Sequence, residues 1–135
     1  MKTDNRARPR RSDLVEITFL EGLRRRCPAN DRVLETLGGL YTQAGLYEEG
    51  LAIDLELVRR RAGDPLAWYN LACSYAQLAR PGDACAALEH AVAVGYGDFQ
   101  WMAKDEDLKG LHGHPRFEAL IRKGAGTPHA FGEER

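Results

Sequence analysis

The feature that most constrains the fold of this chain is an internal repeat. Residues 31–64 and 65–98 carry apolar, small and aromatic residues at matching positions, thirty-four residues apart. The matching pairs are Leu34 and Trp68, Leu37 and Leu71, Gly38 and Ala72, Tyr41 and Tyr75, Gly45 and Ala79, Gly50 and Ala84, and Leu57 and Ala91. A repeat of this length is one supersecondary unit that buries its apolar face against neighbouring units. The sequence therefore predicts an array of stacked units.

The apolar spacing inside residues 65–98 is helical, since positions i, i+3, i+4 and i+7 share one face of a helix. Two successive segments follow this spacing, with Trp68, Leu71, Ala72, Tyr75 and Leu78 in the first and Ala84, Leu88, Ala91 and Val92 in the second. Proline suits the first helical turn and aspartate can cap it, so helix starts are expected at Asp64-Pro65 and at Pro81-Gly82-Asp83. This repeat is predicted to form a helical hairpin whose close approach is allowed by Ala72, Ala79 and Ala84.

Residues 31–64 give a similar prediction with weaker signals. Helices are expected over 31–44 and 47–61, joined by a turn at Gly45-Leu46-Tyr47. Gly50 costs about 0.5–1 kcal/mol of helix propensity relative to alanine, and Asp54 is either partnered or at the edge of the core. Leu51, Leu55 and Val58 form an alternative apolar stripe, which allows the second helix to be rotated about its axis.

The motif Trp68-x-x-Leu71-Ala72-x-x-Tyr75, followed by Ala84, Leu88 and Ala91, resembles the tetratricopeptide repeat (TPR). Repeat 31–64 departs from the family pattern at Leu34, Gly50 and Asp54, where tryptophan, alanine and a large apolar residue are usual. Residues 95–121 are similar to a closing segment found after bacterial TPR arrays. The resemblance implies an all-α fold, a short right-handed α-α superhelix (TPR solenoid) of antiparallel helix hairpins with a helical C-terminal cap.

The expected organisation is one TPR-like domain over residues 12–123. It comprises an N-terminal capping helix (12–28), repeat 1 (31–64), repeat 2 (65–98) and a C-terminal cap (99–123). The large apolar residues of the cap are expected to cover the open end of the array; they are Phe99, Trp101, Leu108, Leu111, Phe117 and Leu120. A flexible basic arm (1–11) and a flexible tail (124–135) complete the 135 residues.

Composition excludes several classes of protein. The chain is 44% hydrophobic and 29% charged, which is typical of globular proteins. Its longest uncharged stretch, residues 65–79, is too short and too polar to span a bilayer. The basic N-terminus is not followed by the apolar region of a secretory signal, so a cytoplasmic location without membrane partners is expected. Cys27, Cys73 and Cys85 are widely spaced and are interpreted as reduced thiols.

The sequence shows no assembled nucleophile and no glycine-rich phosphate loop, so neither enzymatic activity nor a cofactor is predicted. His112 and His114 follow Asp105 and Asp107, and such donors suit zinc or another transition metal. The alternative is a polar turn between two short helices, in which an aspartate caps one helix and His114-Pro115 introduces the next. We prefer the polar turn because the closing-segment resemblance accounts for the aspartates and Pro115 without a metal.

Two arginine triplets occupy nearly equivalent repeat positions and define a predicted basic edge, formed by Arg24, Arg25, Arg26, Arg59, Arg60 and Arg61. Such an edge can attract nucleic acid or an acidic partner protein. It can also be a solvated face whose cations interact with helix C-terminal dipoles. We prefer the second interpretation because no aromatic residues interleave with the arginines for base stacking.

The TPR resemblance implies a concave peptide groove lined by the first helix of each repeat. The groove positions are Arg32, Glu35, Gly39, Thr42 and Gln43 in repeat 1, and Leu66, Tyr69, Asn70, Cys73, Ala76 and Gln77 in repeat 2. Tyr69 offers an apolar face and a hydroxyl, while Asn70 and Gln77 can bond a peptide backbone. Binding of an acidic chaperone tail is disfavoured, since Glu35 stands where TPR carboxylate clamps need a lysine.

These observations favour a non-enzymatic protein-protein interaction module, a TPR scaffold or adaptor that binds a peptide or helix of a partner protein in its groove. One alternative is a structural module that forms homo-oligomers through an exposed end of the array. A nucleic-acid-binding or metal-dependent protein is the alternative from a different class. The sequence does not identify the partner.

Overall fold

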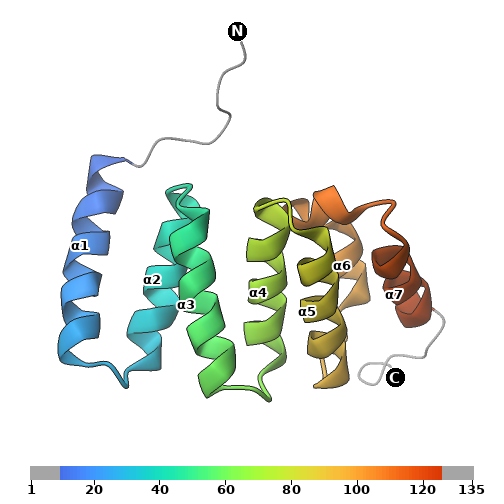
Figure 1. The fold of residues 1–135 in the computed structure, drawn as a ribbon, viewed down its shortest axis with the longest axis horizontal. Coiled ribbons are helices and arrows are strands. Elements are labelled where there is room, and N and C mark those ends of the chain that lie inside the picture. Colours follow the sequence, from blue (N-terminus) through green and yellow to red (C-terminus); the bar gives the residue numbers. More distant parts are fainter. Residues whose placement is uncertain (1–9, 126–135) are drawn as a thin grey trace, which may run out of the picture. The chain divides into compact units, whose positions relative to one another are not determined.

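The computed structural model describes residues 10–125, whose helices are joined by short turns and which contain no strand. Figure 1 shows the helices in chain order: α1 (Arg11–Arg26), α2 (Asp31–Gln43), α3 (Tyr47–Arg60), α4 (Pro65–Gln77), α5 (Pro81–Ala93), α6 (Phe99–Lys104), η1 (Glu106–Leu111) and α7 (Pro115–Ala125). The predicted all-α class is confirmed for these residues. They form two compact units, one ending at Arg60 and the other beginning at Arg61.

Most of the two predicted flexible ends lies outside the described residues. Where the structure does describe them, the expectation is wrong at both boundaries. Arg11 already begins α1, and Gly124 and Ala125 still belong to α7. Within the described residues, no helix is both long enough and apolar enough to cross a membrane.

In the N-terminal unit, α2 packs against both α1 and α3. The core contains Ile17, Leu34, Leu37, Tyr41, Ala44, Ile53 and Leu57. A Cβ added to Gly38 would lie 3.1 Å from Ile53 Cγ2, so the close approach of α2 and α3 requires a very small residue there. Of the alternative apolar stripe on α3, Leu51 and Val58 are buried, whereas Leu55 is 42% exposed. Ile53 and Leu57 belong to the core of this unit. Asp54 is partnered.

In the C-terminal unit, α4 and α5 form a closely packed hairpin. Ala72 and Ala84 are fully buried, as expected for small residues between two helices. Ala79 is not between them: it is exposed in the turn after α4, where its φ of 58° reverses the chain. Trp68 stacks on His90 with ring centroids 3.8 Å apart, and its indole N–H donates to the Ala62 carbonyl at 2.7 Å.

The predicted helix starts of this hairpin are confirmed in part. Pro65 and Pro81 lie in the first turns of α4 and α5, and the Asp64 carboxylate accepts a hydrogen bond from the Leu66 N–H at 2.9 Å. Asp83 was expected to cap α5, but it does not. It lies inside the first turn, where its carboxylate pairs with Arg80 at 2.9 Å.

The segment after the hairpin packs back onto it. η1 contacts α4 and α5, and α7 contacts α5 and α6. Met102, Leu108, Leu111 and Phe117 are buried there, whereas Trp101 is 46% exposed and does not cover the core as expected. Asp98 and Asp105 cap α6 and η1 by accepting backbone N–H bonds of 3.0 and 2.9 Å.

The thirty-four-residue period of the sequence recurs in the helix boundaries. α2 and α4 begin at residues 31 and 65 and end at 43 and 77, while α3 and α5 begin at 47 and 81. The turns also correspond. Gly45 and Ala79 both have positive φ, and the N–H groups that follow them donate to the carbonyls of Tyr41 and Tyr75 at 2.8 and 2.9 Å. Each unit therefore contains one copy of the same helix–turn–helix element, closed by a Schellman-type turn.

Candidate binding site

The predicted groove positions of the first repeat share one side of α2. Arg32, Glu35, Gly39 and Gln43 are exposed. A side chain built at Gly39 would meet no atom within 4 Å, so the helix surface is open at this point. Thr42 is half-buried, and its hydroxyl donates to the Gly38 carbonyl at 3.1 Å. This side of α2 is thus an accessible, mostly polar surface.

The predicted positions on α4 divide into an exposed and a covered set. Leu66 is 60% exposed and Asn70 is also exposed, whereas Cys73, Ala76 and Gln77 are half-buried. The covered residues lie on the helix against which η1 packs. On α4, the accessible part of the predicted groove therefore consists mainly of Leu66 and Asn70.

The expectation for Tyr69 is wrong. Its side chain is buried at 5% exposure, its hydroxyl donates to the Asp105 carboxylate at 2.6 Å, and its ring stacks on Tyr96 at 4.5 Å. Burial, followed by the bond to Asp105, raises the pKa of Tyr69. Neither its face nor its hydroxyl is available to a ligand, because residues after α5 return to cover them.

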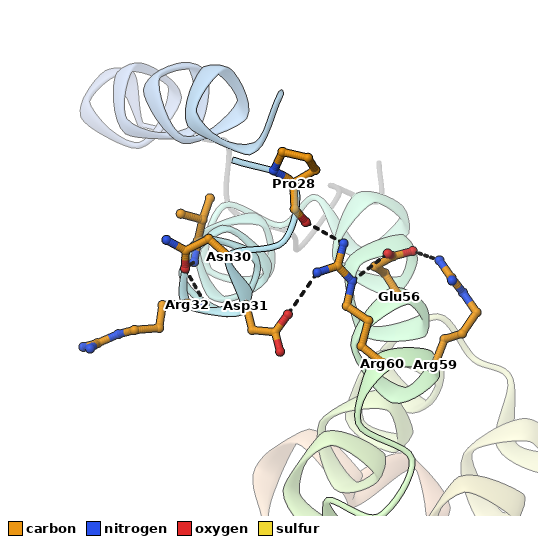
Figure 2. A network of polar contacts seen from close by, with 8 residues as sticks. Pro28, Asn30, Asp31, Arg32, Glu56, Arg59 and Arg60 are labelled. Carbon is orange, nitrogen blue, oxygen red and sulfur yellow. Dashed lines mark hydrogen bonds and ion pairs between the residues drawn. The ribbon is translucent and has the colours of Figure 1, made fainter. Parts of the chain in front are cut away.

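The second arginine triplet of the predicted basic edge is paired with nearby acidic residues. The Arg60 guanidinium donates to the carboxylates of Glu56 at 2.9 Å and Asp31 at 3.0 Å, and to the Pro28 carbonyl at 2.6 Å (Figure 2). Arg59 also bonds Glu56. The hydrogen bond from Arg60 lowers the pKa of Glu56. Arg60 thereby ties the end of α3 to the turn that precedes α2.

The same pairing occurs at the start of the C-terminal unit, where Arg61 lies 3.3 Å from the Asp64 carboxylate. All three arginines of the second triplet thus have a carboxylate partner. A phosphate would have to compete with these carboxylates for the guanidinium groups. The structure therefore gives the nucleic-acid interpretation of this triplet no support.

A pocket of about 560 Å³ lies within the N-terminal unit and brings part of the predicted basic edge together. Its lining residues are Glu21, Arg24, Arg25, Pro28, Tyr41, Glu56 and Arg60. Within residues 10–125, Arg24 and Arg25 have no ion-pair partner, and the exposed Arg26 is outside the lining. The Tyr41 hydroxyl donates to Glu21, and burial, followed by this bond, raises the pKa of Tyr41. The pocket is polar and of mixed charge.

The sequence analysis missed Glu21, Tyr41 and Glu56 as pocket residues. A signal was present for Glu21, because it precedes Arg24 and Arg25 by three and four positions and so shares their side of α1. Tyr41 gave no such signal, since its place in the apolar repeat pattern conceals that its hydroxyl reaches another helix.

His112 and His114 lie apart from the two carboxylates suggested as their co-ligands. The His112 ring stacks on Phe117, and its Nε2 lies 3.1 Å from the Ala103 carbonyl oxygen. His114 Nδ1 accepts the Arg116 N–H at 3.2 Å. Asp105 caps η1 and α7 begins at Pro115, as the polar-turn interpretation expects.

No known protein family's sequence profile matches this chain, and no solved structure matches it. A curated relative from Arabidopsis thaliana, a protein described as chloroplastic, is 32% identical over 117 residues. The alignment covers 83% of this chain but 35% of that protein. The chain therefore corresponds to about a third of the length of this relative.

Proposed function

We propose that this chain is a non-enzymatic interaction module, a short TPR-type superhelix of antiparallel helix hairpins that binds a segment of a partner protein. The recurrence of one hairpin at the thirty-four-residue period carries this proposal. Equivalent positions keep equivalent roles: Gly38 and Ala72 are buried between helices, as are Gly50 and Ala84. Repeats of this kind stack into superhelices that bind ligands on an extended concave surface.

In this proposal each unit offers a partner protein the exposed positions of its first helix, α2 in the N-terminal unit and α4 in the C-terminal unit. Arg32 and Glu35 supply opposite charges, Gly39 leaves room for a ligand, and Leu66 supplies an exposed apolar contact. A segment with an apolar side chain flanked by polar residues complements this surface. An acidic chaperone tail does not, because Glu35 would repel it.

Burial of the thiol–imidazole pair Cys85 and His114 supports a non-enzymatic role. Cys85 Sγ lies 3.7 Å from His114 Nδ1, an arrangement that in an open site can activate a thiol. Cys85 is 1% exposed, however, and burial raises its pKa. A buried, protonated thiol is a poor nucleophile.

Leu66→Glu tests the proposal, with Ala86→Glu as the matched control. Both residues are exposed and belong to the C-terminal unit, but Ala86 lies on α5, outside the proposed binding surface. We expect quantitative affinity capture from the source cells to lose specific proteins with Leu66→Glu and to keep them with Ala86→Glu. If both variants recover the same proteins as the unmodified chain, the proposed binding surface is wrong. Circular dichroism checks that both variants remain helical.

The location of the protein remains a prediction. The sequence favours the cytoplasm, whereas the curated relative is described as chloroplastic. Fluorescence microscopy of the tagged chain in the source cells distinguishes the two compartments.

A further inference from the structure

A thiol and two carboxylates converge where η1 packs on α4. Cys73 belongs to α4, Asp105 caps η1, and Asp107 lies in the first turn of η1. One ligand atom from each of these three residues lies within 4.8 Å of the other two. All three belong to the C-terminal unit. The sequence analysis did not associate Cys73 with the aspartates, because thirty-two residues separate it from Asp105.

Asp105 is held in a fixed orientation by two donors. Its Oδ2 accepts the Tyr69 hydroxyl at 2.6 Å, and its Oδ1 accepts the Asp107 N–H at 2.9 Å. The residue is 7% exposed, so its charge is largely removed from water. Each carboxylate oxygen retains a lone pair after accepting one hydrogen bond. Asp105 is therefore a pre-oriented anionic ligand.

The neighbouring groups favour a cation at this point. Asp105 and Asp107 each offer a carboxylate oxygen, and the two oxygens lie within 4.8 Å of each other. Two carboxylates that repel one another are both stabilised when a divalent cation lies between them. A cation bound between Asp105 and Asp107 would therefore offset the repulsion between their carboxylates.

Gln77 supplies an independent observation. Its side chain hydrogen-bonds the Asp107 carboxylate, which requires the amide nitrogen to face Asp107. The amide oxygen, Gln77 Oε1, is buried and has no hydrogen-bond partner. A buried acceptor without a donor is unfavourable, and a water molecule held by a metal ion is a donor that could reach it.

We infer that Cys73, Asp105 and Asp107 bind a divalent metal ion of the zinc class, with a metal-bound water that donates to Gln77 Oε1. A thiolate ligand favours Zn²⁺, Co²⁺ or a similar ion over Mg²⁺ and Ca²⁺, which prefer oxygen ligands. Three protein ligands and one water complete the four-coordinate geometry common for zinc. The site goes beyond the proposed binding function and does not depend on it.

Titration of the full, untagged and reduced chain with Co²⁺ tests this site, because cobalt–thiolate bonds absorb strongly in the near ultraviolet. We expect a charge-transfer band that saturates at one Co²⁺ per chain and is displaced by Zn²⁺. Cys73→Ser should abolish the band. Cys27→Ser and Cys85→Ser are the matched thiol controls and should retain it. Asp107→Asn should weaken Co²⁺ binding at least about ten-fold while leaving the cap at Asp105 intact.

A second readout separates metal binding from a folding defect. Zn²⁺ should raise the melting temperature of the unmodified chain and of His112→Ala, but not that of Cys73→Ser. Absence of the band at excess Co²⁺, or its persistence in Cys73→Ser, would overturn the site. Loss of the band in His112→Ala, with helicity unchanged, would also overturn it by assigning the metal to the histidine pair.

Discussion

Ala79 and Gly45 occupy equivalent turns but differ in the cost of their backbone conformation. Their φ angles are 58° and 78°, in the left-handed region. Glycine adopts this region freely, whereas a Cβ makes it unfavourable by about 1–2 kcal/mol. Ala79 is held there by the turn in which the Arg80 N–H donates to the Tyr75 carbonyl at 2.9 Å. The α4–α5 turn is thus strained relative to its counterpart.

Ala79→Gly should therefore increase the free energy of unfolding by about 0.5–1 kcal/mol, because relief of strain exceeds the entropy gained by the unfolded chain. Gly45→Ala reverses this balance at the equivalent turn and should lower it by about 0.5–1 kcal/mol. Ala86→Gly is the control in the same unit, at an exposed position inside α5. It should lower the free energy of unfolding by up to about 1 kcal/mol, because glycine is a poor helix former. Urea unfolding followed by circular dichroism measures all three. A loss in Ala79→Gly similar to that in Ala86→Gly would exclude strain at Ala79.

Tyr41 provides a prediction about alkaline pH. The folded chain raises the pKa of Tyr41 above the unfolded value of 10.0, mainly through burial and then through Glu21. The unfolded chain then loses this proton first as the pH rises, so the stability contribution is complete below pH 10 and is lost above it. Tyr41→Phe should lower the free energy of unfolding by about 1.5 kcal/mol at pH 8. Between about pH 9 and 11, this free energy should fall less steeply in the variant than in the unmodified chain. Urea unfolding measures both proteins, and an equally steep fall in their free energies of unfolding over this pH range would contradict this role of Tyr41.

At the scale of helices and turns, Gly124 of α7 lies directly against Phe99 of α6. A Cβ at Gly124 would overlap the ring of Phe99, whereas one at Gly82 would meet nothing within 4 Å. Gly124→Ala should lower the free energy of unfolding by about 1–3 kcal/mol because the contact has no space for a methyl group. Gly82→Ala, in the first turn of α5, is the control and should not destabilise the chain.

Thermal unfolding checks this pair of substitutions. Combination of Gly124→Ala with Phe99→Leu should restore part of the loss, since the smaller side chain frees the overlapping volume. If Gly124→Ala is as stable as Gly82→Ala, α7 does not pack on Phe99 as described. The segment after α5 would then contribute less to the fold than its buried Phe117 suggests.

The positions of α2 to α5 were predictable because several local signals agree. Period, helical spacing and first-turn proline all mark the same boundaries, as at Pro65 and Pro81. Tertiary partners were harder to predict. Periodicity identifies an apolar side but not which element will cover it, so the packing of η1 on α4 was not predicted. Tyr69 was misassigned for the same reason, since it is 5% exposed.

At the scale of the whole molecule, only part of α4 stays accessible to another molecule. Its own η1 covers Tyr69 and half-buries Cys73 and Gln77, while Leu66 and Asn70 stay exposed. The proposed metal site and the proposed binding surface thus use different parts of α4. The candidate site could be predicted from the sequence only where no later segment folds back over the helix.

Site-specific photo-crosslinking tests the proposed binding surface most directly. The residues Arg32 and Leu66 are equivalent exposed positions on α2 and α4, and Ala52 and Ala86 are equivalent exposed positions on α3 and α5. A photoreactive amino acid is placed at each position in turn in the source cells, and the products are identified by mass spectrometry. We expect the same partner to crosslink at residues 32 and 66 and not at 52 and 86. Equal crosslinking at all four positions, or crosslinks at 52 and 86 alone, would contradict the account.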